Sequence, residues 1–539
     1  MIKLSVVLFI GLQATICSAA QNATLPTLTD SLFKKWASPS TPGCAVAIAQ
    51  AGQPVLTRAY GQSDLEHSAP NTSETVFEAG SISKQFTAAA ILLLAQDGKL
   101  SLSDDVRKYI PDMPNYGHPI TVDQLLTHTS GLRDWGSIVE LGGWPRGTRA
   151  VTMEQALALT TRQRSLNFVP GARYSYTNTG YVLAALVVQR VTGKSLAEFT
   201  RERLFVPLGM RHTQWRDNFR RIVPNRAVAY SRAAAGYDQD MPFEDVYGHG
   251  GLLTTVGDLL IWNDALTNNR LGAGITQQLE QTPALPPGQV SEYGRGLSVL
   301  NYRGAAELSH DGATAGYRTW LGRYPEQGLS IALLCNAGDA NPVTLARAIA
   351  QELLAPPASH AVVRSPQVQS TVTSASLAGT FYNELNGAKV SLVYRDGALA
   401  LSNGTALQPQ GTNTFAIKNG TFTFADIDNF IARSAGGEAA RYRRVSHAVS
   451  DRAALAAYAG YYRNDEVMAT YQVIPSTTNL EFRIADKPDY VFHLAPLGPD
   501  TFGGSEIVVR FKRDAKAVIV GASVATHRLF NLQFQKIVH

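Results

Sequence analysis

The sequence predicts a mixed α/β domain followed by two small antiparallel β-barrels. The chain has 539 residues, more than a single hydrophobic core usually holds. Up to about residue 354, strand-like segments lie at both ends with helix-like segments between them, as expected for one mixed sheet covered by helices. The remaining chain is rich in short alternating strands separated by glycine turns, and it repeats itself once.

The mixed sheet is expected to begin with a hairpin. The stretch "GCAVAIAQAGQPVLTRAY" contains two β-rich runs that flank a turn at Gly52. Helical periodicity follows in four stretches, Val122–Leu126, Met153–Leu159, Gly180–Val191 and Thr255–Leu266. Strand signals return at 295–302, 305–310, 317–325 and 328–336, before an amphipathic helix at 342–354. The two ends of this segment are therefore expected to build one sheet.

A change of composition separates the α/β segment from the strand-rich part. Residues 355–376 are rich in Pro and Ser and have no hydrophobic period, which is typical of a linker. Beyond them "LAGTFYNE" returns as "YAGYYRND", so we expect two β units, with one larger β domain as the alternative. The predicted division is an α/β domain at 21–358, a linker at 359–374, and barrels at 375–448 and 452–539.

The N-terminus has the features of a secretory signal. A basic Lys3 precedes an apolar run, and small residues Ser18 and Ala20 stand where a signal peptidase would cleave. We therefore expect residues 1–20 to be a signal peptide and the protein to be exported, periplasmic or secreted. Lipid anchoring at Cys17 is not favoured, because the bulky Ile16 precedes it. No later segment approaches the ~20 apolar residues of a membrane span.

Charge and cysteines exclude other classes. The formal net charge of +5 is spread over 539 residues without a run of like charges, so no nucleic-acid partner is indicated. Outside the signal, Cys44 and Cys335 are the two cysteines, each within an apolar strand-like run. A bridge requires that these strands be neighbours; two free buried thiols are the favoured prediction.

The stretch "FEAGSISKQFTAAAILLLAQDGKL" places a serine and a lysine at the start of an apolar helix. Ser81 and Lys84 are three residues apart, so both project from one helix face with Cβ atoms about 5–6 Å apart. A serine hydroxyl needs such a neighbour to take its proton. The same spacing also suits an N-terminal cap with a solvated lysine, and it recurs at Ser31 and Lys34.

Two further motifs strengthen the catalytic interpretation. "YTN" places Tyr176 and Asn178 before a helix, and "HDG" places His310 and Gly312 at the end of a predicted strand. Each spacing also occurs elsewhere, at Tyr462–Asn464 and at His249–Gly251. Only one set of these motifs has the required settings. Its serine and lysine open a helix, its Tyr-x-Asn element lies in an interhelical loop, and its His-x-Gly element lies on a strand.

In this combination the chain resembles the serine β-lactamase-like or penicillin-recognising hydrolases, which share an SxxK nucleophile, a Tyr/Ser-x-Asn element and a Lys/His-x-Gly strand. Matching phrases in the family's order include "LLTHTSGL", "PLGM", "GGLLTTVGDL" and "YGRGLSV". The resemblance covers nearly all of residues 28–354. It implies a β-lactamase/DD-peptidase-like catalytic domain, and the YxN element is similar to that of the class C β-lactamase, DD-peptidase and esterase branch.

The resemblance also implies roles for individual residues. Ser81 would be acylated, and Lys84 and Tyr176 would share the general base and acid work. For substrate binding, the resemblance implies that Asn178 would bind both the substrate and Lys84. The backbone N–H groups of Ser81 and of Ala313, which follows Gly312, would form the oxyanion hole. No metal or cofactor is needed.

One position departs from the carboxylate-binding members of the family. They usually have lysine where His310 stands, and a histidine is mostly neutral at pH 7. Efficient β-lactamase activity is therefore not expected. Arg318 is a candidate substitute for the missing charge, but a solvated strand arginine is the simpler interpretation.

The His-x-Gly version together with two barrels resembles the three-domain D-aminopeptidase group, in which a barrel loop extends toward the active site and the barrels are lipocalin-like. Asp465 and Glu466 are candidates for binding a substrate amine, although charged turn residues are more often simply solvated. The favoured function is an exported serine hydrolase that cleaves an amide bond of small peptides, including peptides with D-residues. A carboxylesterase with the same machinery and a β-lactam-binding protein without turnover are the alternatives. The partner is a small peptide or ester substrate, and a homo-oligomer is left open.

Overall fold

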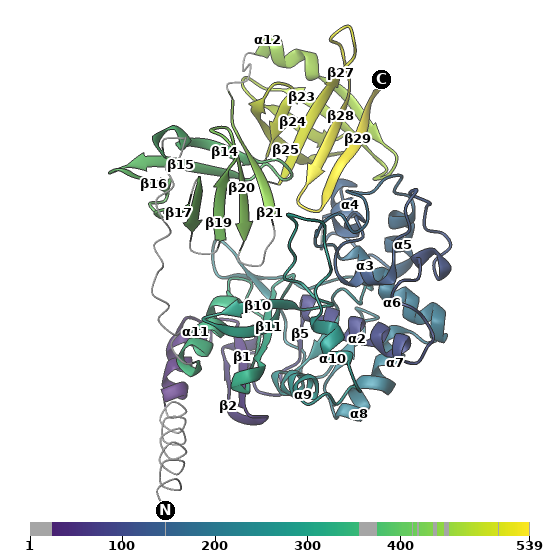
Figure 1. Ribbon diagram of the computed structural model, residues 1–539, viewed down its shortest axis with the longest axis vertical. Coiled ribbons are helices and arrows are strands. Elements are labelled where there is room, and N and C mark those ends of the chain that lie inside the picture. Colours follow the sequence, from purple (N-terminus) through teal and green to yellow (C-terminus); the bar gives the residue numbers. More distant parts are fainter. Residues whose placement is uncertain are drawn as a thin grey trace, which may run out of the picture.

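The computed structural model describes residues 24–145, 147–354, 374–411, 413–417, 420–434, 439–446, 452–504 and 506–537. Figure 1 shows an α/β unit at the bottom and two β-rich units above it, one green and one yellow. The predicted signal peptide, with Cys17, and nearly all of the predicted linker lie outside the described residues. Among the residues described, no helix is both long and apolar enough to cross a membrane.

The α/β unit is built on a six-stranded antiparallel sheet in the order β10-β11-β12-β13-β1-β2. The strands are β1 (Cys44–Gln50), β2 (Gln53–Tyr60), β10 (Ser298–Tyr302), β11 (Ala305–Thr314), β12 (Tyr317–Tyr324) and β13 (Leu329–Cys335). Strand β1 pairs with β13, so the two ends of the segment form one sheet as predicted. The hairpin turn lies at Ala51 and Gly52, and Gly52 has the positive φ of 77° that favours glycine.

Helices cover both faces of this sheet. They are α2 (Ser83–Gln96), α3 (Val122–Leu126), α4 (Trp135–Leu141), α5 (Met153–Thr161), α6 (Thr179–Thr192), α7 (Leu196–Thr200), α8 (Val206–Leu208), α9 (Val256–Thr267), α10 (Ile275–Glu280) and α11 (Pro342–Leu353). Short helical turns are η1 (Lys34–Trp36), η2 (Gly80–Ile82), η3 (Val106–Lys108), η4 (Arg201–Phe205) and η5 (Pro325–Gln327). Capping boxes at Thr121, Thr152 and Ser195 begin α3, α5 and α7. All four predicted interior helices are therefore confirmed.

Small strands complete the α/β unit around the helices. They are β3 (Gln62–Asp64), β4 (Ala69–Pro70), β5 (Phe77–Glu78), β6 (Gln214–Trp215), β7 (Tyr230–Arg232), β8 (Tyr237–Gln239) and β9 (Leu252–Thr254). Strand β9 lies between His249 and α9. It pairs with β5, and so holds the segment after His249 close to the start of α2.

Strand β1 shows why the sheet needs helices on both sides. Ala45, Ala47 and Ala49 belong to one core cluster with α2, α6 and α9. Cys44, Val46 and Ile48 point to the other face, where α11 packs. Because successive side chains alternate between faces, a strand buried on both sides is apolar throughout.

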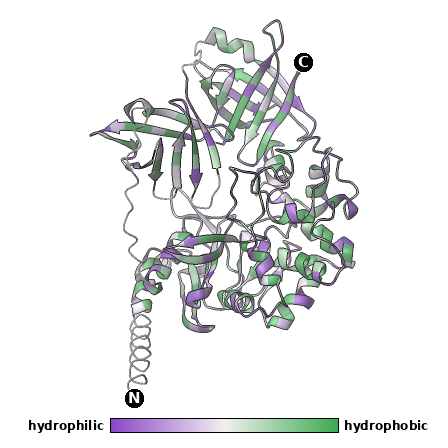
Figure 2. Cartoon of the chain, viewed as in Figure 1, coloured by the Kyte–Doolittle hydropathy of each residue, from purple (hydrophilic) through white to green (hydrophobic). Residues whose placement is uncertain are grey.

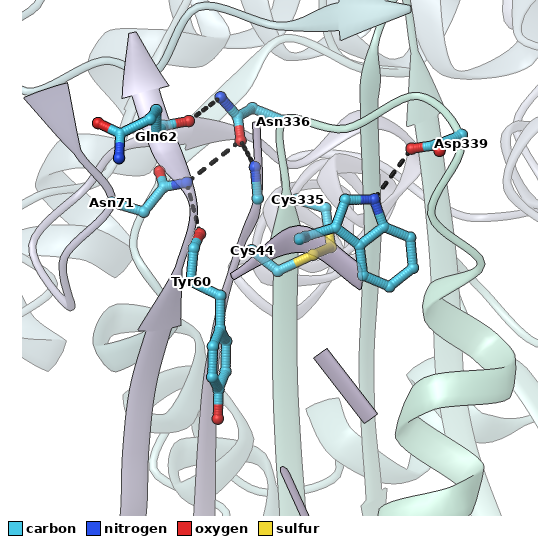
Figure 3. Close-up of a disulfide and its surroundings, with 9 residues drawn as sticks. Cys44, Tyr60, Gln62, Asn71, Cys335, Asn336 and Asp339 are labelled. Atoms are coloured by element: carbon cyan, nitrogen blue, oxygen red, sulfur yellow. Dashed lines mark hydrogen bonds between the residues drawn. A yellow bond between two sulfur atoms is a disulfide. The ribbon is translucent and has the colours of Figure 1, made fainter. Parts of the chain in front are cut away.

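The two cysteines form a disulfide, so the prediction of two free thiols is wrong. Cys44 and Cys335 lie directly opposite each other in the β1–β13 ladder, and their sulfur atoms are bonded. Figure 3 shows the bridge beside Asn336, whose side-chain oxygen accepts from the N–H of Gly43 and from the amide of Asn71. Composition carries no information on strand register, and register is what places the two sulfur atoms together.

The first β-rich unit is a single sheet of eight antiparallel strands in the order β16-β15-β14-β21-β20-β19-β18-β17. After the short turn η6 (Ser374–Leu377), its strands are β14 (Gly379–Asn383), β15 (Lys389–Arg395), β16 (Ala398–Leu401), β17 (Gln408–Gly411), β18 (Thr414–Ile417), β19 (Gly420–Phe424), β20 (Asn429–Ser434) and β21 (Ala439–Arg444). The predicted fold class is confirmed with two differences. The sheet of the α/β unit is antiparallel throughout instead of mixed, and the first β-rich unit is an open, curled sheet instead of a closed barrel. Pro409 lacks the N–H that a further ladder would need, and β17 is exposed along its length.

The second β-rich unit is a closed eight-stranded barrel. A short helix α12 (Arg452–Leu455) and turn η7 (Ala456–Tyr458) precede β22 (Gly460–Asn464), β23 (Ala469–Pro475), β24 (Leu480–Ile484), β25 (Lys487–Gly498), β26 (Thr501–Gly503), β27 (Ile507–Arg513), β28 (Ile519–Thr526) and β29 (Leu529–Ile537). Hydrophilic and hydrophobic residues alternate along its strands in Figure 2, as expected when one face of each strand fills the barrel. The repeated phrases predicted from the sequence form the equivalent strands β14 and β22.

The closed barrel is fixed to the α/β unit, which contains the predicted catalytic residues, through α4. Ile138 and Leu141 of this helix belong to the barrel's own hydrophobic core. The hydroxyl of Tyr471 donates to the carbonyl of Leu141 at 2.8 Å. Glu466, a predicted candidate for amine binding, instead forms a buried ion pair with Arg133 at 2.7 Å. Asp465, the other candidate, is exposed and pairs with Arg463.

Candidate active site

Ser81 lies in the turn η2, directly before α2. Gly80 takes a positive φ of 54°, which bends the chain from β5 into the helix. Strand β10 pairs with β11 only between Ala305 and Ser309, so the far half of β11 lies against η2. The serine is thus held between the N-terminus of a buried helix and the end of a central strand.

Lys84 lies in the first turn of α2 and is fully buried. Its Nζ lies 3.0 Å from Ser81 Oγ, 2.9 Å from Asn178 Oδ1 and 2.6 Å from the carbonyl oxygen of His249. The amide and carbonyl oxygens can only accept, so they take N–H groups of the amine. The side chain is therefore aimed at the serine hydroxyl by two fixed acceptors.

Tyr176 closes the site on the other side of the serine. Its hydroxyl hydrogen bonds with Ser81, and burial raises the pKa of this phenol well above its usual range. The guanidinium of Arg528 lies 4.8 Å from the centre of the Tyr176 ring and offsets part of that rise in pKa. The ring also packs on His128, with centroids 4.2 Å apart. The phenol is accordingly protonated at neutral pH.

Asn178 is placed by the start of α6. Its backbone N–H donates to the carboxylate of Asp134 at 2.7 Å, and Asp134 also caps α4. One carboxylate thereby fixes two helix starts. The side chain of Asn178 then lies within hydrogen-bond distance of Lys84.

His310 is buried on β11. Its Nδ1 lies 2.5 Å from the carbonyl oxygen of Asp311 and its Nε2 lies 2.9 Å from the hydroxyl of Tyr293. A carbonyl can only accept, so Nδ1 carries the proton and Nε2 accepts from the tyrosine. Burial lowers the pKa of His310 to about 4. The ring is therefore neutral at pH 7, as expected from the sequence.

Gly80 and Gly312 allow two backbone segments to approach closely. A Cβ on Gly312 would lie 2.2 Å from the carbonyl oxygen of Ala79 and 3.1 Å from the nitrogen of Ser81. A Cβ on Gly80 would lie 2.9 Å from the nitrogen of Ala313. The N–H groups of Ser81 and Ala313, the pair expected to hold an oxyanion, thus belong to segments in direct contact.

These groups surround a cavity of about 300 Å³. The lining includes Ser81, Tyr176, Asn178, His310 and Ala313, while Lys84 lies beneath it. Every predicted site residue is therefore brought to one place. Arg318 bonds with carbonyl oxygens of its own turn and does not line the cavity.

Sequence reasoning missed three residues of this site in particular. His249 acts through its backbone carbonyl, which no side-chain motif reveals. His527 and Arg528 come from the turn between β28 and β29 of the barrel and line the cavity. The carbonyl of Arg528 accepts from the N–H of Asp134, so this turn is bound to the catalytic unit. The signal that could have located it is the resemblance to a group with a barrel loop near the site.

Comparison with known proteins defines the class. Residues 28–355 match the family described as Beta-lactamase. The match covers more than half of the chain, so the chain belongs to this family of serine hydrolases.

Within that class, two curated relatives narrow the assignment. Penicillin-binding protein 4* of Bacillus subtilis is 29% identical over 311 residues, covering 54% of this chain and 67% of that protein. A D-aminopeptidase of Brucella anthropi is 31% identical over 313 residues, covering 56% of this chain and 58% of that protein. The matched region thus spans little more than half the length of the D-aminopeptidase.

One solved structure resembles most of the chain. The octameric penicillin-binding protein homologue from Pyrococcus abyssi aligns with a TM-score of 0.55 and 22% identity, over 85% of this chain and 97% of that one. At this identity the likeness shows the fold alone.

Proposed function

We propose that this protein is an exported serine hydrolase that cleaves an amide bond of small peptides, including peptides with D-residues, through an acyl-enzyme on Ser81. The observation that carries the proposal is the contact of Ser81 Oγ with both Lys84 Nζ and the Tyr176 hydroxyl. The relationship to a D-aminopeptidase supports the substrate class.

In the acylation step Lys84 is the base. Two of its N–H bonds point to Asn178 and to the carbonyl of His249, so the lone pair of an unprotonated amine points to Ser81. The serine proton passes to Lys84 as Oγ bonds to the substrate carbonyl carbon. The N–H groups of Ser81 and Ala313 then hold the oxyanion, a type of contact worth about 10²–10³ in rate.

Tyr176 supplies the proton for the leaving group. Its raised pKa keeps the phenol protonated before the reaction. As the C–N bond breaks, the phenol gives its proton to the departing nitrogen and recovers one from the Lys84 ammonium. Water then attacks the ester on Ser81, gives its proton to the same pair, and releases the acid with the serine restored.

The decisive experiment compares variants of the two SxxK pairs in the chain. We expect Ser81→Ala to abolish hydrolysis of D-amino acid p-nitroanilides and Lys84→Ala to reduce kcat by about 10²–10⁴. The matched controls are Ser31→Ala, in the helix before η1, and Lys34→Ala, in η1; neither residue lines the cavity, so both variants should retain full activity. Unchanged activity in Lys84→Ala would contradict the proposal.

A substrate panel separates the peptidase from its closest rival. We would measure the activity of the wild-type protein on D- and L-amino acid amides, short nitrophenyl esters and a chromogenic β-lactam. The relative rates show which leaving group and which stereochemistry the enzyme prefers. Turnover of esters alone would identify a carboxylesterase, and labelling without turnover would identify a β-lactam-binding protein.

Export is supported by the disulfide, because such bonds persist in oxidising compartments. Fractionation of cells that express the full chain, with N-terminal sequencing of the mature protein, tests both the compartment and cleavage after residue 20. An octameric relative makes a homo-oligomer a reasonable part of the proposal. Light scattering of the purified protein measures it directly.

A further inference from the structure

A second cavity of about 850 Å³ lies beside the active site where all three units meet. The catalytic unit contributes Arg173–Ser175, the open sheet contributes residues of β14 and β18–β21, and the barrel contributes His527 and Phe530. Tyr174 and His527 line both this cavity and the smaller one beside Ser81. The two spaces are therefore neighbours that share a wall.

Arg173 is a charged side chain for which the described residues provide no ionic partner. Its guanidinium is held between two rings, 4.8 Å from the centre of Phe168 and 5.1 Å from that of Phe530. Its Nε–H is buried and donates to no acceptor in the described part of the chain, although the residue as a whole is only half-buried. A buried donor without an acceptor is costly, so this guanidinium is suited to receive an anion.

The surrounding charge increases that cost. Burial and the nearby Arg441 lower the pKa of Arg173. Arg441 lines the cavity from β21, and the one carboxylate among the described lining residues, Glu384, pairs with Arg443. The described lining thus carries an excess of positive charge that a bound carboxylate would neutralise.

The same cavity has an apolar wall. Ile431 of the open sheet, which lies directly opposite Arg441 in the ladder of β20 and β21, and Phe530 of the barrel line it. Ile431 is 36% exposed, so its side chain is open to contact with a bound molecule. A volume of this size is in the upper part of the ~300–1,000 Å³ range of small-molecule sites.

We infer that this cavity is a substrate subsite for peptides that extend beyond the scissile bond and carry a carboxylate bound by Arg173 and Arg441, with an apolar side chain against Ile431. The inference rests on the proposed hydrolysis at Ser81, because it assigns the cavity to the distal part of the same substrate. It makes the open sheet a part of substrate recognition.

Two matched peptide series test the inference. Each series compares peptides that differ only in having glutamate or glutamine two to four residues from the scissile amide. In one series this residue is on the acyl side, and in the other it is on the leaving-group side. We expect glutamate to lower KM about tenfold relative to glutamine in one series, since a charge-assisted hydrogen bond supplies about that much. Arg173→Gln and Arg441→Gln should remove the preference, while Arg173→Lys should retain part of it.

The control variant is Arg395→Gln, which is exposed on β15 of the same sheet and does not line the cavity. It should keep the preference for glutamate. All variants should hydrolyse a single D-amino acid p-nitroanilide at the wild-type rate, because that substrate occupies only the cavity beside Ser81. Equal KM for glutamate and glutamine peptides in both series, or a preference that survives in both glutamine variants, would overturn the inference.

Binding to Ser81→Ala protein separates this inference from the proposed function. Calorimetry with the preferred glutamate peptide should show binding that Arg173→Gln in the same background weakens about tenfold. If Ser81→Ala still turned the peptide over, the proposed function would fail. If it bound both peptides equally without turnover, the function would stand and the subsite would be rejected.

Discussion

His310 is neutral at pH 7 because its ring is buried between the carbonyl of Asp311 and the hydroxyl of Tyr293. In the unfolded chain this imidazole has its ordinary pKa of about 6.5, whereas in the folded protein the pKa is about 4. Between these values the unfolded state binds more protons than the native state. Stability is therefore complete above pH 6.5 and is lost as pH falls toward 4.

We expect the free energy of unfolding to fall by about 3 kcal/mol between pH 6.5 and pH 4 from this residue alone. Urea denaturation at a series of pH values measures the slope. The variant His310→Gln should show a shallower slope, since its amide does not titrate. An identical slope in both proteins would contradict the assignment.

Asp311 follows His310 and is exposed in the lining of the active-site cavity. Its carboxylate is well placed to bind the free amine of an aminopeptidase substrate. We expect Asp311→Asn to raise KM about tenfold for substrates with a free amine. N-acetylated analogues and simple esters, which lack that charge, should be unaffected; a parallel loss on all of them would indicate a structural role instead.

At this scale the sequence indicated the side chains and, through the family resemblance, the N–H groups of Ser81 and Ala313, but not the carbonyl of His249. Ser81, Lys84 and Tyr176 were found because their chemistry requires particular residue types at particular spacings. Any residue at position 249 would provide a backbone carbonyl, so no sequence motif indicates this contact with Lys84. Arg528 is about 350 residues from Tyr176 in the sequence, and only the folded arrangement brings the two together.

Among the elements, the disulfide between β1 and β13 has a measurable consequence. It closes a loop of 291 residues in the unfolded chain, and disulfides typically add about 2–4 kcal/mol of stability. We expect the double variant Cys44→Ala, Cys335→Ala to have a melting temperature several degrees lower than that of the oxidised protein. Activity at 25 °C should be retained, since neither sulfur lines the site.

A reducing agent should lower the melting temperature of the wild type and leave that of the double variant unchanged. Equal melting temperatures of the oxidised and reduced wild type would show that the ladder between β1 and β13 holds the sheet without the bridge.

Elements with local signals were predicted well. Thr121 and Thr152 begin their helices through capping boxes that can be read from four consecutive residues. Closure of a sheet is different, because it depends on whether its first and last strands can pair. Pro409 in the edge strand β17 opposes that pairing, and its meaning becomes clear only once the strand order is known.

In the whole molecule, the ion pair of Arg133 with Glu466 ties the barrel to the catalytic unit. The side chains are 1% and 11% exposed, and Glu466 also accepts from the N–H of Arg164 at 2.8 Å. Removing one partner from such a buried pair costs about 3–5 kcal/mol because the other charge is left in a dry interface.

We therefore expect Glu466→Gln to weaken docking of the barrel and to reduce kcat/KM, because His527 and Arg528 would leave the cavity. Limited proteolysis and denaturant titration measure the loosening. Asp465→Asn, one residue away and exposed, is the control and should behave as wild type. Glu466→Gln with wild-type proteolysis and kinetics would contradict this role.

The arrangement of the three units was the part that sequence reasoning could not supply. The repeated phrases predicted two β units, yet nothing in them indicates that α4 inserts Ile138 and Leu141 into the barrel core. The contact of α4 with Tyr471 of the barrel joins residues 330 positions apart, and single-sequence patterns extend over a few turns at most.

The central sheet joins an N-terminal hairpin to strands made much later. With 291 residues between Cys44 and Cys335, and synthesis at about 5–20 residues per second, the partner of β1 leaves the ribosome some 15–60 s after it. Throughout that delay an apolar strand has one unpaired edge. The nascent chain therefore depends on chaperones, or on remaining unfolded until it is complete, and the bridge can form only at the end.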